Sequence, residues 1–272
     1  MQINALLRQM FIMLIVTAGL WLWQMLARVL PDAGLLASLV VFVAVIAVGL
    51  WHRVQIRRRV WLNAYFLPNS PLHRRLRGGL WMGVVQGATA VVLSVILAAA
   101  LLRSHSLWVW ISFLLAALLL PVLALVISRR LEAHAHANYR GVLSLRLSAL
   151  FLGLLLWGGL IYQSYHASYP DFRGATLDQA VWYMMSTQQA RSEFLLGLLE
   201  LSSAGEAMRL WLAQRLLPAP ITSLWQGIAW CLVLAQEALF VWSYLMLCSG
   251  ALRLGALRRV RSSNIEGGDD AR

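Results

Sequence analysis

One carboxylate, Glu237, lies in the middle of the apolar stretch CLVLAQEALFVW, which runs from Cys231 to Trp242. A charged side chain at the centre of a bilayer costs about 2.5 kcal/mol or more, so an acid at this depth indicates a functional site by default. The apolar stretches hold no arginine at the same depth, and we therefore expect Glu237 to have no ion-pair partner within the chain. Without such a partner the carboxyl is expected to be protonated, because a bare buried charge is too costly.

Three interpretations of Glu237 are open. As a protonated group it can donate a hydrogen bond to a polar side chain on a neighbouring span and so hold helices together. It can also take part in a proton or substrate pathway, or pair with a basic residue of another protein. The polar side chains that we single out with Glu237 at membrane depth are Gln24, Gln86 and Gln236, with Thr89 and Ser243 as further hydrogen-bond candidates.

The segment LEAHAHANYRG places His134 and His136 close to Glu132, which raises the question of a metal site. On a helix, residues two apart point about 200° apart and cannot bind one ion. In an extended segment they share a side, but no cysteine or third histidine is nearby to complete a ligand set. The sequence also has no lysine, hence no nucleotide-binding loop ending in Gly-Lys, and it contains neither GxSxG nor HExxH. We therefore expect no metal, no cofactor and no enzymatic activity.

Three glycines, Gly79, Gly83 and Gly87, open an apolar segment at four-residue spacing, which places them on one face of a helix. Small residues at this spacing let the backbone of another helix approach closely. The stripe predicts a helix-packing face, either inside the bundle or between copies of the chain in a homo-oligomer. Gln86, beside the stripe, can add an interhelical hydrogen bond.

The composition is that of a membrane protein, with 60% hydrophobic and 12% charged residues among 272, against roughly 25% charged residues in an average soluble domain. A helix needs about 20 apolar residues to cross a bilayer. We predict an all-α polytopic membrane protein with six transmembrane helices, at residues 9–30, 35–51, 79–102, 107–128, 142–162 and 221–247. The predicted divisions are five spans with basic loops (1–165), an amphipathic helical segment (166–220), the sixth span (221–250) and a polar tail (251–272).

The basic residues are all arginines, and most fall on one of the two sides that this layout implies. Cytoplasmic loops carry the excess of positive charge, so we predict that both termini are cytoplasmic and that the membrane is a bacterial inner membrane. The densest group flanks spans, which indicates a role in topology or in binding anionic lipid and not in binding nucleic acid. This group comprises Arg57, Arg58, Arg59, Arg74, Arg75 and Arg77.

The segment 166–220 holds two helix-start signatures, Thr176-Leu-Asp-Gln179 and Ser203-Ala-Gly-Glu206. In each, a hydroxyl and a polar side chain three residues later can bind each other's free backbone N–H groups. Apolar and polar residues also separate onto opposite faces. We therefore predict two amphipathic helices on the periplasmic side, between the fifth and sixth spans, which lie on the membrane, pack on the bundle or bind a partner.

These observations favour a non-enzymatic inner-membrane protein that is a subunit or assembly factor of a larger envelope complex, of a secretion, conjugation or biogenesis type. Its expected partners are the lipid bilayer and other membrane proteins or further copies of the chain. The alternative is a transport permease. Six spans, inner termini, a basic loop after the second span and paired outer helices before the sixth are similar in outline to permease subunits of the ABC-2 export type. That resemblance implies a separate ATPase that docks on the inner loops, and it assigns no functional residue.

Overall fold

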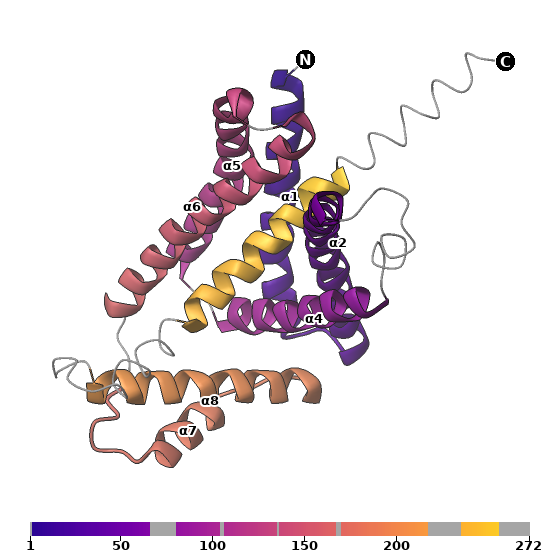
Figure 1. The fold of residues 1–272 in the computed structure, drawn as a ribbon. Coiled ribbons are helices and arrows are strands. Elements are labelled where there is room, and N and C mark those ends of the chain that lie inside the picture. Colours follow the sequence, from indigo (N-terminus) through magenta and orange to yellow (C-terminus); the bar gives the residue numbers. More distant parts are fainter. Residues whose placement is uncertain are drawn as a thin grey trace.

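A computed structural model describes residues 2–65, 80–103, 106–134, 136–166, 170–216 and 235–255, and every regular element in this part of the chain is a helix. The apolar segments form helices because a helix satisfies its own backbone hydrogen bonds. Figure 1 shows their arrangement. In chain order they are α1 (Gln2–Ala27), α2 (Asp32–Tyr65), α4 (Leu80–Arg103), α5 (Leu107–Arg130), the short 3-10 helix η1 (Leu131–Ala133), α6 (Ala137–His166), α7 (Leu177–Ser186), α8 (Glu193–Leu216) and a C-terminal helix (Ala235–Gly255).

Six of these helices are long and apolar enough to cross a membrane, as a multi-pass membrane protein requires, and each overlaps one of the predicted spans. Two bounds differ from the sequence prediction. The second helix continues past the predicted span 35–51 as far as Tyr65, because arginine is a good helix former. The last helix continues to Gly255 instead of ending at Leu247. The cytoplasmic location of the termini and the division into segments stay predictions.

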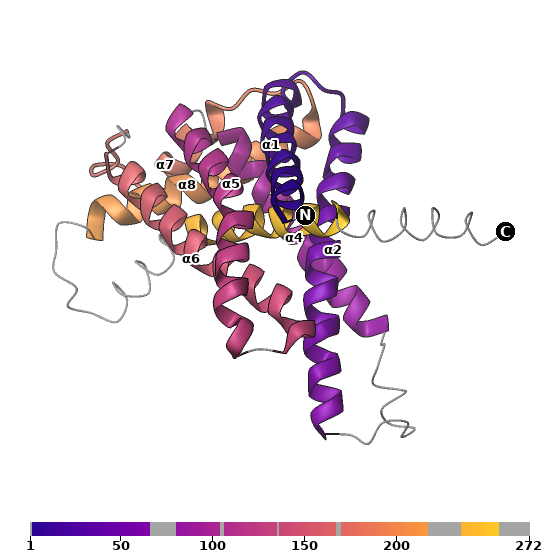
Figure 2. The same ribbon diagram turned by 90° about the horizontal axis from the view of Figure 1, so that it is seen from above.

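The C-terminal helix is the centre of the bundle. In its apolar window 61% of the residues are buried, against 22% to 44% in the other five candidate spans. Figure 1 and Figure 2 show it, in yellow, between the α5–α6 pair and the α2–α4 pair. Its Tyr244 is fully buried, stacks on Phe113 of α5 with ring centroids 4.4 Å apart, and donates a 2.8 Å hydrogen bond to the Phe113 carbonyl. Thr17 of α1 lies 3.3 Å from the same hydroxyl.

Two glycines outside the predicted stripe allow a close approach between two helix backbones. A Cβ atom on Gly49 of α2 would lie 3.2 Å from the Cα of Gly250 in the C-terminal helix, and one on Gly250 would collide with the Val45 carbonyl. Only glycine therefore fits at this crossing. Of the predicted stripe, Gly83 faces Trp51 at 3.4 Å, whereas a Cβ on Gly87 would meet nothing within 4 Å among the described residues. Gly79 lies outside them.

The two helices α7 and α8 form a hairpin that packs across one end of the bundle (Figure 1). The first helix-start signature is confirmed. Thr176 Oγ1 accepts from the Gln179 backbone at 3.3 Å, and Gln179 Oε1 accepts from the Thr176 backbone at 3.0 Å. The second is wrong, because Ser203 and Glu206 lie inside α8. That helix begins earlier, where Ser192 Oγ accepts from the Leu195 backbone at 3.1 Å.

Candidate functional site: an ion network between the hairpin and the bundle

Glu237 forms an ion pair within the chain, so the expectation that it has no such partner is wrong. It lies in the first turn of the described part of the C-terminal helix, and its Oε1 accepts from Arg209 Nη1 of α8. Both residues are buried, with exposed fractions of 7% for Glu237 and 8% for Arg209. The reason is that α8, predicted to lie outside the membrane, covers this end of the C-terminal helix and carries its arginine inward.

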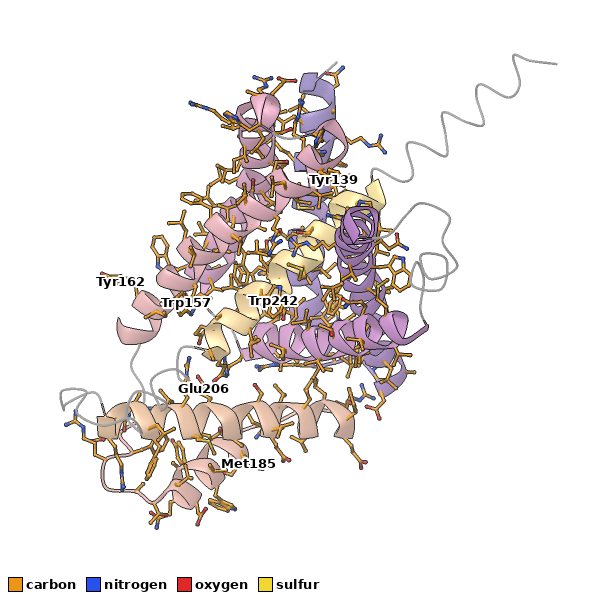
Figure 3. All side chains as sticks on the ribbon, viewed as in Figure 1. Tyr139, Trp157, Tyr162, Met185, Glu206 and Trp242 are labelled. Carbon is orange, nitrogen blue, oxygen red and sulfur yellow. The ribbon has the colours of Figure 1, made fainter. Side chains whose placement is uncertain are left out.

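The pair belongs to a larger network that we call the hairpin network: Arg103, Glu206, Arg209, Gln236 and Glu237. Glu206 lies 3.6 Å from Arg209 Nη2 and 3.5 Å from Arg103 Nε, at the end of α4. With its amide oxygen turned toward Arg103, Gln236 accepts from Nη1 and Nη2 at 2.6 and 3.2 Å. Figure 3 shows Glu206 on the side of α8 that faces the C-terminal helix.

Charges alternate along the hairpin network, which contains two arginines and two glutamates. Each ionised group therefore has an opposite neighbour, and the network as a whole is neutral. A buried ion pair of this kind contributes little net stability against an apolar replacement, but removing one partner is costly, since a charge is left buried alone. The network thus fastens α4, α8 and the C-terminal helix to one another in a specific arrangement.

A second contact holds the other end of α8. The hydroxyl of Ser192, which caps α8, donates to Asp32 Oδ1 at the start of α2. Beside it, Leu195 and Leu199 of α8 are buried in a small apolar cluster with Leu35, Ala27 and Leu102 of the bundle. The hairpin is therefore attached at both ends of its longer helix.

The four predicted polar residues separate into one pair and two single positions. Gln236 and Glu237 come together in the hairpin network. Gln24 accepts from Trp110 Nε1 at 3.0 Å and donates to the Leu101 carbonyl at 2.8 Å, so it joins α1, α4 and α5. Gln86 is half-buried near the opposite end of α4. A proton or substrate pathway through Glu237 stays a prediction.

The remaining predicted sites have separate positions. Glu132, which the sequence groups with His134 and His136, pairs with Arg140 at 2.6 Å. The backbone of α2 includes Arg57, Arg58 and Arg59, beyond its apolar stretch. Outside the described residues lie Arg74, Arg75 and Arg77.

Sequence reasoning missed three members of the hairpin network: Arg103, Glu206 and Arg209. Glu206 and Arg209 are three apart, a spacing that brings opposite charges together on a helix, but the amphipathic pattern assigned Glu206 to a solvated face. Arg103 directly follows the predicted span 79–102, and no local pattern marks it as the partner of an acid. Comparison with protein-family models, with curated proteins and with solved structures finds no match for this chain.

Proposed function

We propose that this chain is a non-enzymatic integral membrane protein that serves as a subunit or assembly factor of a larger complex in a bacterial inner membrane, of a secretion, conjugation or biogenesis type. The observation that carries the proposal is the hairpin α7–α8. One side of it is fastened to the bundle through the hairpin network and the Ser192 contact. Its other side carries large exposed apolar side chains, which are typical of a binding surface.

The exposed residues of α8 follow a regular spacing. Phe194, Leu201 and Met208 are seven residues apart, so they share one face of the helix, and Leu201 is 72% exposed. Trp182 and Tyr183 add two exposed aromatic rings on α7. Apolar side chains every seventh residue are what a partner helix needs in order to pack alongside. A platform that is rigidly held and apolar on its free side suits assembly better than catalysis.

The experiment is site-specific photocrosslinking in cells. A benzoylphenylalanine side chain replaces Leu201, and a matched control replaces Val40, which is 66% exposed on the apolar span of α2. We expect a discrete protein adduct from position 201 and no such adduct from position 40. The crosslinked protein should also co-purify with the chain in gentle detergent in stoichiometric amount. Absence of a protein adduct from positions 201, 194 and 182 would contradict the proposal.

A transport permease that works with a separate ATPase is the second candidate, and the length of α2 favours it. Its 34 residues span about 51 Å at 1.5 Å per residue, against about 30 Å of hydrocarbon. Figure 2 shows α2 extending beyond its neighbours. The extension carries Arg57, Arg58 and Arg59 and offers a helical surface to which an ATPase can dock.

The same purification separates the two candidates. A permease is expected to co-purify with an ATPase in stoichiometric amount, and replacement of Arg57, Arg58 and Arg59 together by glutamine should release it. Envelope proteins without an ATPase support the first candidate. A clean monomer would count against both.

A further inference from the structure

A groove of about 420 Å³ lies between α6 and the C-terminal helix and runs along that helix from Ala238, next to the hairpin network, to Met246. Its wall on α6 includes Gly153, where a Cβ atom would lie 3.1 Å from Cδ1 of Leu245, so the Leu245 side chain of the C-terminal helix packs directly on the α6 backbone. Trp157 and Trp242 also line it, and Figure 3 shows both between the two helices. The volume is within the range of roughly 300–1,000 Å³ that is common for small-molecule sites.

The groove opens sideways from the bundle. On its rim Leu154 is 64% exposed, and Leu150 and Trp242 are also exposed. All three belong to segments apolar and long enough to span a membrane. An opening at that position faces acyl chains and not water, so the natural occupant of the apolar part is a hydrocarbon chain.

One end of the groove is strongly basic. Arg53 of α2 and Arg146 of α6 line it, and Arg53 interacts electrostatically both with Arg146 and with Arg253 at the end of the C-terminal helix. The close crossing at Gly49 and Gly250 explains this, because Arg53 and Arg253 follow these glycines by one helical turn on each helix.

No carboxylate balances these three arginines within the described part of the chain, where the ion pairs involve other arginines. Among the described residues, the one acceptor for Arg53 Nη1 is a weak one, Met246 Sδ, at 3.3 Å. The Nε and Nη1 atoms of Arg253 are shielded from solvent and make no hydrogen bond to described residues. Buried donors without acceptors are costly, and neighbouring like charges repel, so an anion would stabilise this cluster.

We propose that the groove binds an anionic phospholipid, with one acyl chain in the apolar part and the headgroup phosphate on Arg53, Arg146 and Arg253. A phosphate supplies several acceptor oxygens, for which the guanidinium group is well matched. The arginine distribution along the sequence assigns this end to the cytoplasmic side, where anionic lipids are abundant. The proposal does not depend on whether the chain is an assembly subunit or a permease.

The test uses the full-length protein, delipidated in a mild detergent, and counts bound lipid by native mass spectrometry. The probes are phosphatidylglycerol and, with the same acyl chains, phosphatidylcholine. We expect one tightly held phosphatidylglycerol per chain, preferred at least several-fold over phosphatidylcholine. Equal retention of the two lipids would overturn the proposal. It would also be overturned if inorganic phosphate alone bound as tightly as phosphatidylglycerol.

Variants locate the site. Arg146→Gln and Arg253→Gln should each weaken phosphatidylglycerol binding by about tenfold, the effect of losing a charge-assisted hydrogen bond. The matched control is Arg130→Gln, which removes the same charge from an exposed position at the end of α5 and should have no effect. Arg253→Lys, which keeps the charge, should restore most of the binding and so distinguishes lost affinity from lost folding. An equal loss in Arg130→Gln would mean unspecific attraction and contradict the proposal.

Two further variants test the acyl end and the chain's own acids. Ala238→Phe fills the groove while leaving the arginines in place, and it should abolish retention of the lipid. Neutralising Glu266, Asp269 and Asp270 together should leave lipid binding unchanged. If the lipid bound only after these acids were removed, the chain itself would be the counter-ion and the proposal would be wrong.

Discussion

The described part of the C-terminal helix carries a charged site near each of its limits, and the two sites are built on opposite principles. At Glu237 two arginines alternate with two glutamates, and every charge has a neighbour of opposite sign. At Arg253, three arginines from three helices come together, and no carboxylate of the described residues joins them. These two positions are sixteen residues apart, which corresponds to about 24 Å of helix. The first site is complete within the chain, whereas the second is complete only with an anion from outside.

The largest effect is expected from removing one partner of the ion pair between Arg209 and Glu237. Arg209→Met leaves Glu237 buried without its partner and should lower the free energy of unfolding by about 3–5 kcal/mol. Arg209→Met combined with Glu237→Met removes both charges and should recover most of that loss. The measurement is reversible unfolding in mild detergent, monitored by circular dichroism.

The control for this cycle is Arg173→Met, which removes an exposed arginine next to α7 and should change little. If the single and double variants lost the same stability, the two residues would not act as a pair. Unchanged stability of Glu237→Gln would instead support the protonated carboxyl that the sequence alone predicts.

An intermediate effect is expected from a substitution at the helix crossing that brings Arg53 and Arg253 together. Gly250→Ala introduces a Cβ atom against the Val45 carbonyl, and such overpacking costs typically about 1–3 kcal/mol. It should also separate Arg53 from Arg253 and weaken phosphatidylglycerol binding without removing any charge. Gly87→Ala is the matched control, since a Cβ there meets nothing within 4 Å among the described residues. If Gly250→Ala and Gly87→Ala changed the free energy of unfolding equally, the close contact between Gly250 and the Val45 carbonyl would be refuted.

The smallest effect, and one of opposite sign, is expected from removing a charge at the incomplete site. In lipid-free detergent, Arg253→Gln relieves repulsion with Arg53 and should raise the free energy of unfolding by up to about 1 kcal/mol. The gain should shrink as salt is added, because ions screen the repulsion. Once phosphatidylglycerol is present, the same substitution should become destabilising. If Arg253→Gln lowered the free energy of unfolding in the absence of lipid, repulsion between the arginines would not destabilise this site. That result would contradict the difference drawn between the two sites.

The positions of the apolar helices could be predicted from the sequence because a span must be long and continuously apolar, which is a local property. The capping box at Thr176 could be predicted for the same reason. The pattern at Ser203 misled because a hydroxyl followed by glutamate is equally compatible with the interior of a helix. The partner of Glu237 could not be predicted, since Arg209 reaches it only through the packing of α8 on the bundle. Gly49 and Gly250 stand outside any glycine stripe and meet only by tertiary contact.

The central position of the C-terminal helix has a consequence for how the protein is made. Five candidate spans are synthesised before Ala235–Gly255, and the side chains that later pack against Tyr244 have no partner until it arrives. Until then, the earlier helices lack the helix that fills the centre of the bundle. Insertion of the last helix closes that centre, joins α8 to the bundle through Glu237 and brings Arg253 to Arg53. The hairpin network and the proposed lipid groove therefore form together, only after Ala235–Gly255 has been synthesised.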